Sequence, residues 1–170
     1  MPGHASRLFA AAVAAAIWST PLVAKECYAP DARFSDPVFP RLDAAGVATM
    51  WRMLCSRGRD LRVVASNIDA DDSKGRAHWV ATYTYSATRR AVVNEVDATF
   101  TFEDGRIVRH EDRFDLHRWA MQALGLPGLL FGWAPPMQNA IRRKAGEALA
   151  AWRAKVPGAM LGSPAEPGSA

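Results

Sequence analysis

Cysteine is scarce in this sequence, because only Cys27 and Cys55 occur among its 170 residues. Two thiols cannot build the disulfide framework of a small secreted scaffold, and they are too few for a zinc site with four thiolate ligands. The sequence also lacks a glycine-rich phosphate loop and a cluster of metal-ligating residues, so we expect no cofactor and no metal site. Charge of one sign is not concentrated either: 21 basic residues face 17 acidic ones. This mild excess does not indicate nucleic-acid binding.

Long hydrophobic runs are missing as well. The run from Leu8 to Trp18 is too short to span a bilayer. It is long enough for the hydrophobic region of a signal peptide, but a cut after Ala24 would place the large Leu22 where a small residue is preferred. We favour the alternative, a first helix from about Ala5 to Trp18 that packs on the rest of the chain. We therefore expect a cytoplasmic protein.

What the sequence contains is typical of one globular domain, with 49% hydrophobic and 22% charged residues. Apolar residues at helical spacing predict a helix between Asp43, an N-cap, and Gly58, a C-cap. The period then changes to two, which is typical of strands. Asp104-Gly105 is a strong signal for a two-residue hairpin turn. The predicted strands are Leu61 to Ala70, Arg76 to Ala87, Ala91 to Phe102 and Arg106 to Leu116.

Helices followed by long antiparallel strands predict an α+β fold, with the helices packed on one face of a curved sheet. A short first strand is predicted from Ala32 to Asp36, after a turn at Tyr28 to Asp31. The helical period returns after Leu116, and the predicted last helix, from Met137 to Lys155, is basic. We divide the chain into an α+β domain over 1–116, a helical C-terminal extension over 117–156 that packs on this domain, and a disordered tail over 157–170.

Two motifs resemble the nuclear transport factor 2-like superfamily, more specifically its SnoaL-like and ketosteroid isomerase-like branches. Tyr28 to Pro37 is similar to the first-strand motif, and Phe100 to Asp115 is similar to the terminal hairpin. The resemblance covers about Ala5 to Leu116. It implies a cone, in which a strongly bent sheet wraps around N-terminal helices and leaves a deep apolar pocket at its open end. Because this fold hosts isomerases, polyketide cyclases, epoxide hydrolases and non-catalytic binding domains, it does not by itself define a reaction.

Asp36 is the first catalytic candidate. It shares a strand face with Phe34, and burial beside apolar groups raises the pKa of a carboxyl group. Asp36-Pro37 is also similar to the Asp-Pro pair whose aspartate is the general base of ketosteroid isomerases, and this resemblance implies the same role here. The alternative is an aspartate that only caps the turn at Pro37, since Asp-Pro is a common turn pair. The sequence leaves both interpretations open.

His110 and Asp112 form the second candidate pair. They alternate on one strand face with Val108 and Phe114, which predicts that they point inward. A histidine beside a carboxylate can act as an acid–base pair, with Asp112 raising the pKa of His110. The alternative is a satisfied polar pair at the rim of the fold. His-x-Asp alone is too weak a pattern for a metal site.

Asp97 is a weaker catalytic candidate. Its strand resembles the one whose aspartic acid donates to the oxyanion in ketosteroid isomerases. Alternation, however, places Asp97 opposite Phe100 and Phe102, so only a β-bulge would turn it inward. Those isomerases also use a tyrosine from the first helix, and the run from Leu8 to Trp18 has none. We therefore do not expect a complete steroid isomerase site.

Aromatic side chains are the candidates for a pocket wall, although such rows are more often plain core or an oligomer interface. The uncharged segment from Leu124 to Pro136 is a candidate lid over the pocket. Its alternatives are a cover for the domain's own core, or insertion into a membrane interface beside the basic helix. The substrate-binding candidates are Phe34, Trp51, Trp79, Tyr83, Tyr85, Phe131 and Trp133.

Together these features predict a SnoaL-like domain with a pocket for an apolar small molecule. The first hypothesis is a cofactor-free acid–base enzyme of isomerase, cyclase or epoxide-hydrolase type. The alternatives are a non-catalytic binding module for an apolar ligand, and an interaction domain whose sheet pairs with a second copy in a homodimer. We expect no nucleic-acid partner, and we do not favour membrane contact.

Overall fold

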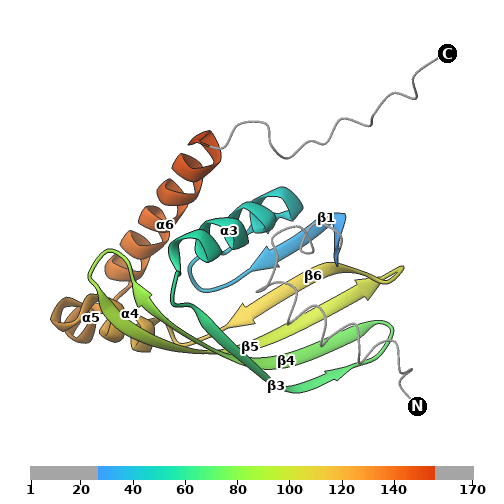
Figure 1. The fold of residues 1–170 in the computed structure, drawn as a ribbon, viewed down its shortest axis with the longest axis horizontal. Coiled ribbons are helices and arrows are strands. Elements are labelled where there is room, and N and C mark those ends of the chain that lie inside the picture. Colours follow the sequence, from blue (N-terminus) through green and yellow to red (C-terminus); the bar gives the residue numbers. More distant parts are fainter. Residues whose placement is uncertain (1–26, 156–170) are drawn as a thin grey trace.

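A six-stranded sheet forms the frame of this computed structural model, which describes residues 27–155 (Figure 1). The strands lie in the order β2-β1-β6-β5-β4-β3, and every neighbouring pair is antiparallel except β1 and β6. The predicted helix from Ala5 to Trp18 lies outside the described residues. The strands are β1 (Tyr28–Ser35), β2 (Leu42–Asp43), β3 (Arg62–Ala70), β4 (Lys74–Tyr85), β5 (Arg90–Glu103) and β6 (Arg106–Arg113).

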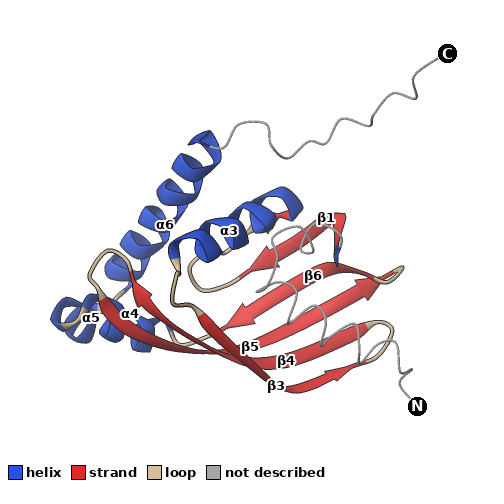
Figure 2. Ribbon diagram, in the orientation of Figure 1, coloured by secondary structure: helices blue, strands red, loops and turns tan. Residues whose placement is uncertain are grey.

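Helices lie on one side of the curved sheet and at one of its ends, which confirms the predicted α+β fold (Figure 2). The helix α3 lies over the sheet, and it begins where predicted, because Oδ1 of Asp43 accepts a hydrogen bond of 2.7 Å from the Gly46 amide. The later helices gather at the end of the sheet beside the β4–β5 turn. The helices are α3 (Ala44–Arg57), α4 (Leu116–Leu124), α5 (Leu126–Phe131) and α6 (Pro135–Lys155).

The largest differences from the predicted strand boundaries occur at β1 and β6. The turn predicted at Tyr28 to Asp31 is wrong, because β1 already begins at Tyr28. Its pairing with β6 shifts register between Tyr28 and Arg33, and this irregularity interrupts the alternation that would have revealed a strand. The strand β6 ends at Arg113 because Asp115 caps α4 by accepting a hydrogen bond from the Arg118 amide.

Two apolar clusters make up the described core. The first lies between the sheet and α3, and its larger members include Phe34, Trp51, Trp79, Phe100 and Ile107. The second joins the end of the sheet to α4 and α6, and its buried members are Val92, Leu116, Trp119, Ala120, Ala123 and Ile141. Val38 and Phe114 pack against both clusters. The C-terminal helices are therefore packed against the sheet and contribute to its core.

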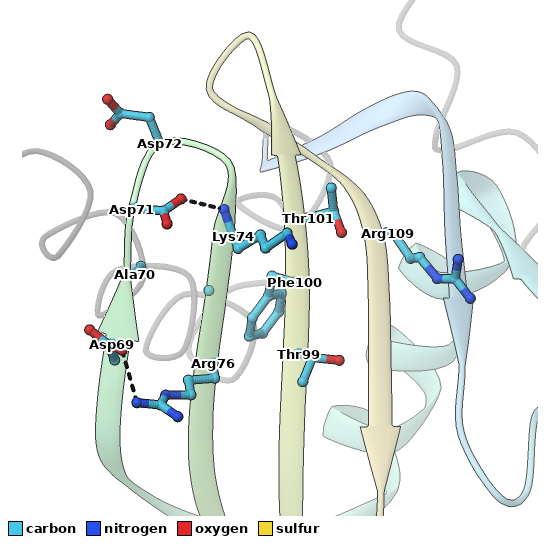
Figure 3. A pocket seen from close by; sticks show the side chains of 11 residues that line it. Asp69, Ala70, Asp71, Asp72, Lys74, Arg76, Thr99, Phe100, Thr101 and Arg109 are labelled. Atoms are coloured by element: carbon cyan, nitrogen blue, oxygen red, sulfur yellow. Dashed lines mark hydrogen bonds and ion pairs between the residues drawn. The ribbon is translucent and has the colours of Figure 1, made fainter. Parts of the chain in front are cut away.

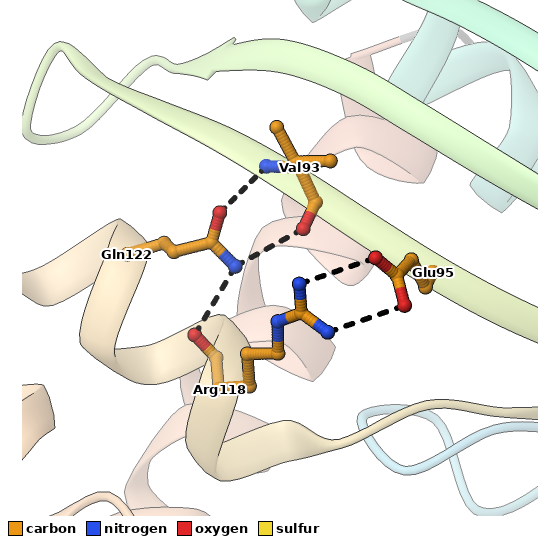
Figure 4. A network of polar contacts seen from close by, with 4 residues as sticks. All are labelled: Val93, Glu95, Arg118 and Gln122. Carbon is orange, nitrogen blue, oxygen red and sulfur yellow. Dashed lines mark hydrogen bonds and ion pairs between the residues drawn. The ribbon is translucent and has the colours of Figure 1, made fainter.

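Polar contacts fix α4 to β5 alongside this apolar packing (Figure 4). Gln122 pairs with the backbone of Val93 in the manner of another strand, since its Oε1 accepts from the amide at 2.7 Å and its Nε2 donates to the carbonyl at 3.0 Å. The guanidinium of Arg118 donates to both carboxylate oxygens of Glu95. The helix thus has a defined position on the sheet rather than a merely apolar contact.

Candidate active site

Asp36 lies in the turn directly after β1 and is half-buried. One carboxylate oxygen, Oδ1, accepts hydrogen bonds from the amides of Val38 at 2.6 Å and Phe39 at 2.5 Å. The Asp36 amide in turn donates to the Phe39 carbonyl at 3.0 Å. Asp36 therefore does cap the turn at Pro37, and this contact fixes the orientation of its carboxylate without excluding a chemical role.

Burial raises the pKa of the Asp36 carboxyl from 3.8 to about 7. The two backbone hydrogen bonds oppose this effect because they stabilise the carboxylate, and the negative charge of Asp112 adds to it. His110 has a smaller effect in the opposite direction. The electrostatic influence of Asp112 and His110 indicates that the three predicted residues lie in one neighbourhood. A carboxyl group with a pKa near neutrality can both accept and return a proton.

The parallel pairing of β1 with β6 explains this neighbourhood. Phe34 lies opposite His110, and Ser35 lies opposite Glu111. One step further along each chain, Asp36 and Asp112 follow. Asp36 and Asp112 are 76 residues apart in sequence, but they follow paired residues at the same end of two parallel strands.

A buried chain of hydrogen bonds runs through the centre of this region. The Tyr28 hydroxyl lies 2.5 Å from Nδ1 of His110, and Nε2 of His110 lies 2.8 Å from Oδ1 of Asp112. The exposed fractions are 4% for Tyr28, 0% for His110 and 6% for Asp112. Polar groups at this depth need such partners, because an unpaired one would destabilise the fold.

The direction of the protons in this chain follows from Tyr28. Burial, together with the charge of Asp112, raises the pKa of Tyr28 well above its usual value, so the hydroxyl keeps its proton. With a neutral His110 ring, that proton is donated to Nδ1, and the ring proton on Nε2 is donated to Asp112. A hydrogen bond with the Trp51 side chain has the opposite effect, because it lowers the pKa of Tyr28. The chain therefore directs its donors toward the Asp112 carboxylate.

Aromatic rings enclose His110. Their centroids lie 4.4 Å away for Phe100, 4.9 Å for Phe34 and 5.9 Å for Trp79. Trp51 packs edge-on against Phe34 at 6.1 Å. Three predicted binding residues, Phe34, Trp51 and Trp79, are thus brought to the predicted catalytic group. Whether they line an open pocket stays a prediction.

The other predicted binding residues lie elsewhere. Tyr83 and Tyr85 pack against α4: the Trp119 indole donates to the Tyr83 hydroxyl at 2.8 Å, and the Tyr85 ring meets Trp119 at 5.3 Å. Phe131 and Trp133 are exposed. The structure does not bring these four residues to His110. Tyr83 and Tyr85 lie near the end of β4, where the sheet contacts α4. Phe131, on α5, and Trp133, just after it, face solvent.

Asp97 is not brought into the cluster either. Its side chain is 79% exposed on the outer face of the sheet and pairs with Nδ1 of His78 at 2.8 Å. The β4–β5 register is regular through this position, and the irregularity between β5 and β6 falls later, at Thr101 and Phe102. No bulge therefore turns Asp97 inward.

Tyr28 is the residue of this cluster that the sequence interpretation missed. It belongs to the first-strand motif, but it was assigned to a turn because the alternation is interrupted between Tyr28 and Arg33. A bulky aromatic residue directly before Ala29 and Pro30 was the available signal that the strand begins earlier.

Two hollows occur at other places on the described surface. One of about 830 Å³ lies at the β3–β4 turn, where Asp71 accepts from the Lys74 amide and Arg76 pairs with Asp69 (Figure 3). The other, of about 760 Å³, lies between the β1–β2 edge, α3 and α6 and reaches Val38 and Phe39 beside the Asp36 turn. Neither of these two hollows is lined by Asp36, His110 or Asp112. Within residues 27–155, no group of three metal-ligating side chains is placed to hold an ion.

Comparison with known proteins identifies a family for this chain. Residues 7–110 match the SnoaL-like domain. No curated protein matches the sequence significantly.

Solved structures share the fold at low sequence identity. IdmH from Streptomyces antibioticus, described as a candidate polyketide cyclase, is 23% identical with a TM-score of 0.58, over 69% of this chain and 96% of that one. A protein of Catenulispora acidiphila with a ketosteroid isomerase-like fold is 15% identical, with a TM-score of 0.61 over 75% and 97%. An LEH-like epoxide hydrolase from M. tuberculosis is 21% identical, with a TM-score of 0.57 over 72% and 92%. These similarities support the architecture alone.

Proposed function

Because the chain belongs to the SnoaL-like domain family, we propose that it is an acid–base enzyme that moves a proton on an apolar, carbonyl-bearing small molecule. The observation that carries the proposal is the position of Asp36. This half-buried carboxyl group lies beside the buried chain of Tyr28, His110 and Asp112 and is held in place by two backbone amides. Solved neighbours named as a candidate polyketide cyclase and an epoxide hydrolase have the same architecture.

In the proposed mechanism Asp36 is the general base. Its carboxylate removes a proton from the carbon next to the substrate carbonyl, and the electron pair of that C–H bond moves onto the carbonyl oxygen as an enolate. In a β,γ-unsaturated ketone this enolate is conjugated with the C=C bond, so the same carboxyl group returns the proton at the γ carbon, which gives isomerisation. Alternatively, the enolate carbon attacks a second carbonyl of the same molecule, which takes up the proton and closes a ring. Neither route oxidises or reduces the substrate, so neither needs a redox partner.

Asp112 and His110 have a supporting role in this proposal. The negative charge of Asp112 helps to keep the pKa of Asp36 high, which makes Asp36 a stronger base. His110 donates to Asp112 and receives from Tyr28, so the position of that charge is fixed. The rings of Phe34 and Trp79 exclude water from the surroundings and strengthen these electrostatic effects.

The proposal is tested by proton exchange into a simple probe. 2-Tetralone is an apolar ketone with acidic α-protons, and its α-deuteration in D₂O can be followed by NMR. We expect the wild-type protein to accelerate this exchange, and the Asp36→Asn variant to lose about 10²–10⁴-fold of the acceleration. Asp97→Asn, which removes an exposed carboxylate from the outer face, is the matched control and should keep the wild-type rate. Equal rates in the two variants would rule out Asp36 as the base.

One observation favours the alternative, a non-catalytic binding module. His110 is fully buried, and both of its ring nitrogens already have partners, as in a structural polar network. If this alternative holds, 2-tetralone binds with a measurable affinity but exchanges no faster than in buffer, and Asp36→Asn leaves that affinity unchanged.

A further inference from the structure

Five large apolar side chains on α5 and the turn after it are exposed to solvent. Each is between 52% and 67% exposed, and together they are five of the eight large hydrophobic residues that are exposed in the described part of the chain. Monomeric soluble proteins rarely keep such a contiguous patch without a function for it. We call these residues the α5 patch: Leu126, Leu129, Leu130, Phe131 and Trp133.

The outward orientation of the α5 patch is a consequence of two glycines. A Cβ at Gly128 would lie 1.9 Å from the Ala120 carbonyl oxygen, and a Cβ at Gly132 would lie 2.9 Å from the Ala120 Cβ. The side of α5 that faces α4 therefore has room for hydrogen atoms only. All larger side chains of this short helix are directed away from the protein. Because these side chains are apolar, the exposed face of α5 is apolar.

Backbone groups beside the α5 patch are already satisfied within the protein. The Trp133 indole donates to the Leu130 carbonyl at 3.0 Å, and Nε2 of the Gln138 side chain donates to the Gly132 carbonyl at 3.3 Å. Helix-terminal carbonyls without such partners are costly to move into an apolar medium. These internal hydrogen bonds reduce that cost where the patch leaves water.

The α5 patch has a basic border. Residues 119–141 contain no charged side chain. The exposed Arg90 lies next to the patch, because its guanidinium is 3.2 Å from where a Cβ of Gly125 would be. Further along the chain, the exposed Arg143 and Lys144 follow about two turns into α6.

Two acidic residues near this border have basic partners. Both carboxylate oxygens of Glu95 accept from Arg118 (Figure 4), and Glu147 lies 3.9 Å from Arg143. Arg90, Arg143 and Lys144 together carry three positive charges against the one negative charge of Glu147, so the net charge of these groups is positive and complements an anionic surface. It disfavours a symmetric dimer through the patch, because an isologous interface would bring the basic borders of two copies together.

We propose that the α5 patch docks this protein onto an anionic phospholipid surface. The apolar side chains insert into the interface, and Arg90, Arg143 and Lys144 contact lipid headgroups. Figure 1 shows α5 at one end of the molecule, where it can reach a flat surface. No helix within residues 27–155 has the length and hydropathy to cross a bilayer, so the contact is peripheral. This proposal is independent of the proposed enzymatic function.

The test is flotation of the full chain with lipid vesicles. We expect binding to phosphatidylcholine vesicles that contain about 30% phosphatidylglycerol, and weaker binding to phosphatidylcholine alone. The Leu129→Gln/Phe131→Gln variant should bind at least about tenfold more weakly to the anionic vesicles. The Arg143→Gln/Lys144→Gln variant should also bind about tenfold more weakly to the anionic vesicles, with no change on phosphatidylcholine alone.

The matched control is Leu54→Gln/Val64→Gln, which changes two exposed apolar residues outside the patch and should bind like the wild type. Circular dichroism of each variant verifies the fold. The proposal is overturned if the wild-type chain binds no vesicles, or if the patch variant binds as well as the control, since another segment would then make the contact. It is also overturned if the wild type forms dimers in solution that the patch variant abolishes, because a second copy would then cover the patch.

Discussion

At the scale of single residues, the structure places Asp36 and the pair of His110 and Asp112 in one neighbourhood. The sequence could predict that Asp36 and the pair of His110 and Asp112 face inward, because strand alternation fixes the face on which each side chain lies. Alternation alone does not bring them together, because their proximity also depends on β1 pairing with β6 in parallel. The sequence could not assign Tyr28 to the group either, because the alternation within β1 is irregular there.

Tyr28 should contribute to stability through its hydroxyl group. We expect Tyr28→Phe to lower the free energy of unfolding by about 1–3 kcal/mol, because Nδ1 of the buried His110 loses its partner. Tyr85→Phe is the matched control, since the Tyr85 ring packs on Trp119 at a half-exposed site. It should change the free energy of unfolding by less than about 0.5 kcal/mol. Equal effects in urea denaturation would contradict the buried chain.

Asp36 should make stability depend on pH in a specific direction. The folded protein keeps this carboxyl protonated up to about pH 7, whereas the unfolded chain ionises it above 3.8. The folded state thus binds more protons in this window, so the stabilisation is complete below the unfolded pKa and is lost as the pH rises through 7. The difference between the two pKa values corresponds to at most about 4 kcal/mol.

Comparison of the Asp36→Asn variant with the wild type isolates this contribution. Urea denaturation at several pH values should give a wild-type free energy of unfolding that falls, relative to that of the variant, as the pH rises from about 4 to about 7. A difference that does not change with pH would show that Asp36 ionises normally in the folded protein.

At the scale of elements, the sequence predicted most helices and strands because their periods and caps are local properties. Asp43 and Gly58 flank α3 as expected, and Asp104 and Gly105 make the tight turn with φ values of 49° and 72°. The ends of β1 and β6 were less predictable. A register shift and a helix cap determine them, and each depends on neighbouring elements.

The contact between α4 and α5 should depend on glycine. Gly128→Ala places a methyl group where the Ala120 carbonyl oxygen lies, so we expect overpacking to lower the free energy of unfolding by about 1–3 kcal/mol. Gly146→Ala is the matched control in α6, because a Cβ there meets no atom within 4 Å. The control should gain up to about 1 kcal/mol from helix propensity. Thermal unfolding of both variants gives the comparison, and a neutral Gly128→Ala would contradict the close approach.

At the scale of the whole molecule, the C-terminal helices belong to the structural core. The sequence divided them off as an extension over 117–156, since the period changes there, and this boundary stays a prediction. In the structure α6 buries Ile141 and Leu149, and Nε of Arg142 donates to the Pro37 carbonyl beside Asp36 at 2.9 Å. The helix therefore contributes both apolar burial and a contact at the turn that holds Asp36.

Removal of α6 should destabilise the protein strongly. A chain that ends at Ala134 loses two buried apolar side chains worth about 1.5–3 kcal/mol each, so we expect the Tm to fall by on the order of 10 °C or more. A chain that ends at Val156 lacks only the predicted tail over 157–170 and should keep the wild-type Tm. Equal Tm values for the two truncated chains in calorimetry would contradict a structural role for α6.

Asp36 is the proposed base, with a pKa of about 7 beside His110 and Asp112. The most direct measurement is a ¹³C NMR titration of the aspartate carboxyl groups, with the Asp36 signal assigned by its loss in Asp36→Asn. We predict a titration midpoint of about pH 7 for Asp36, and a lower midpoint in the Asp112→Asn variant, because the neighbouring negative charge is removed. A midpoint near the ordinary value of 3.8, unchanged by Asp112→Asn, would contradict this prediction.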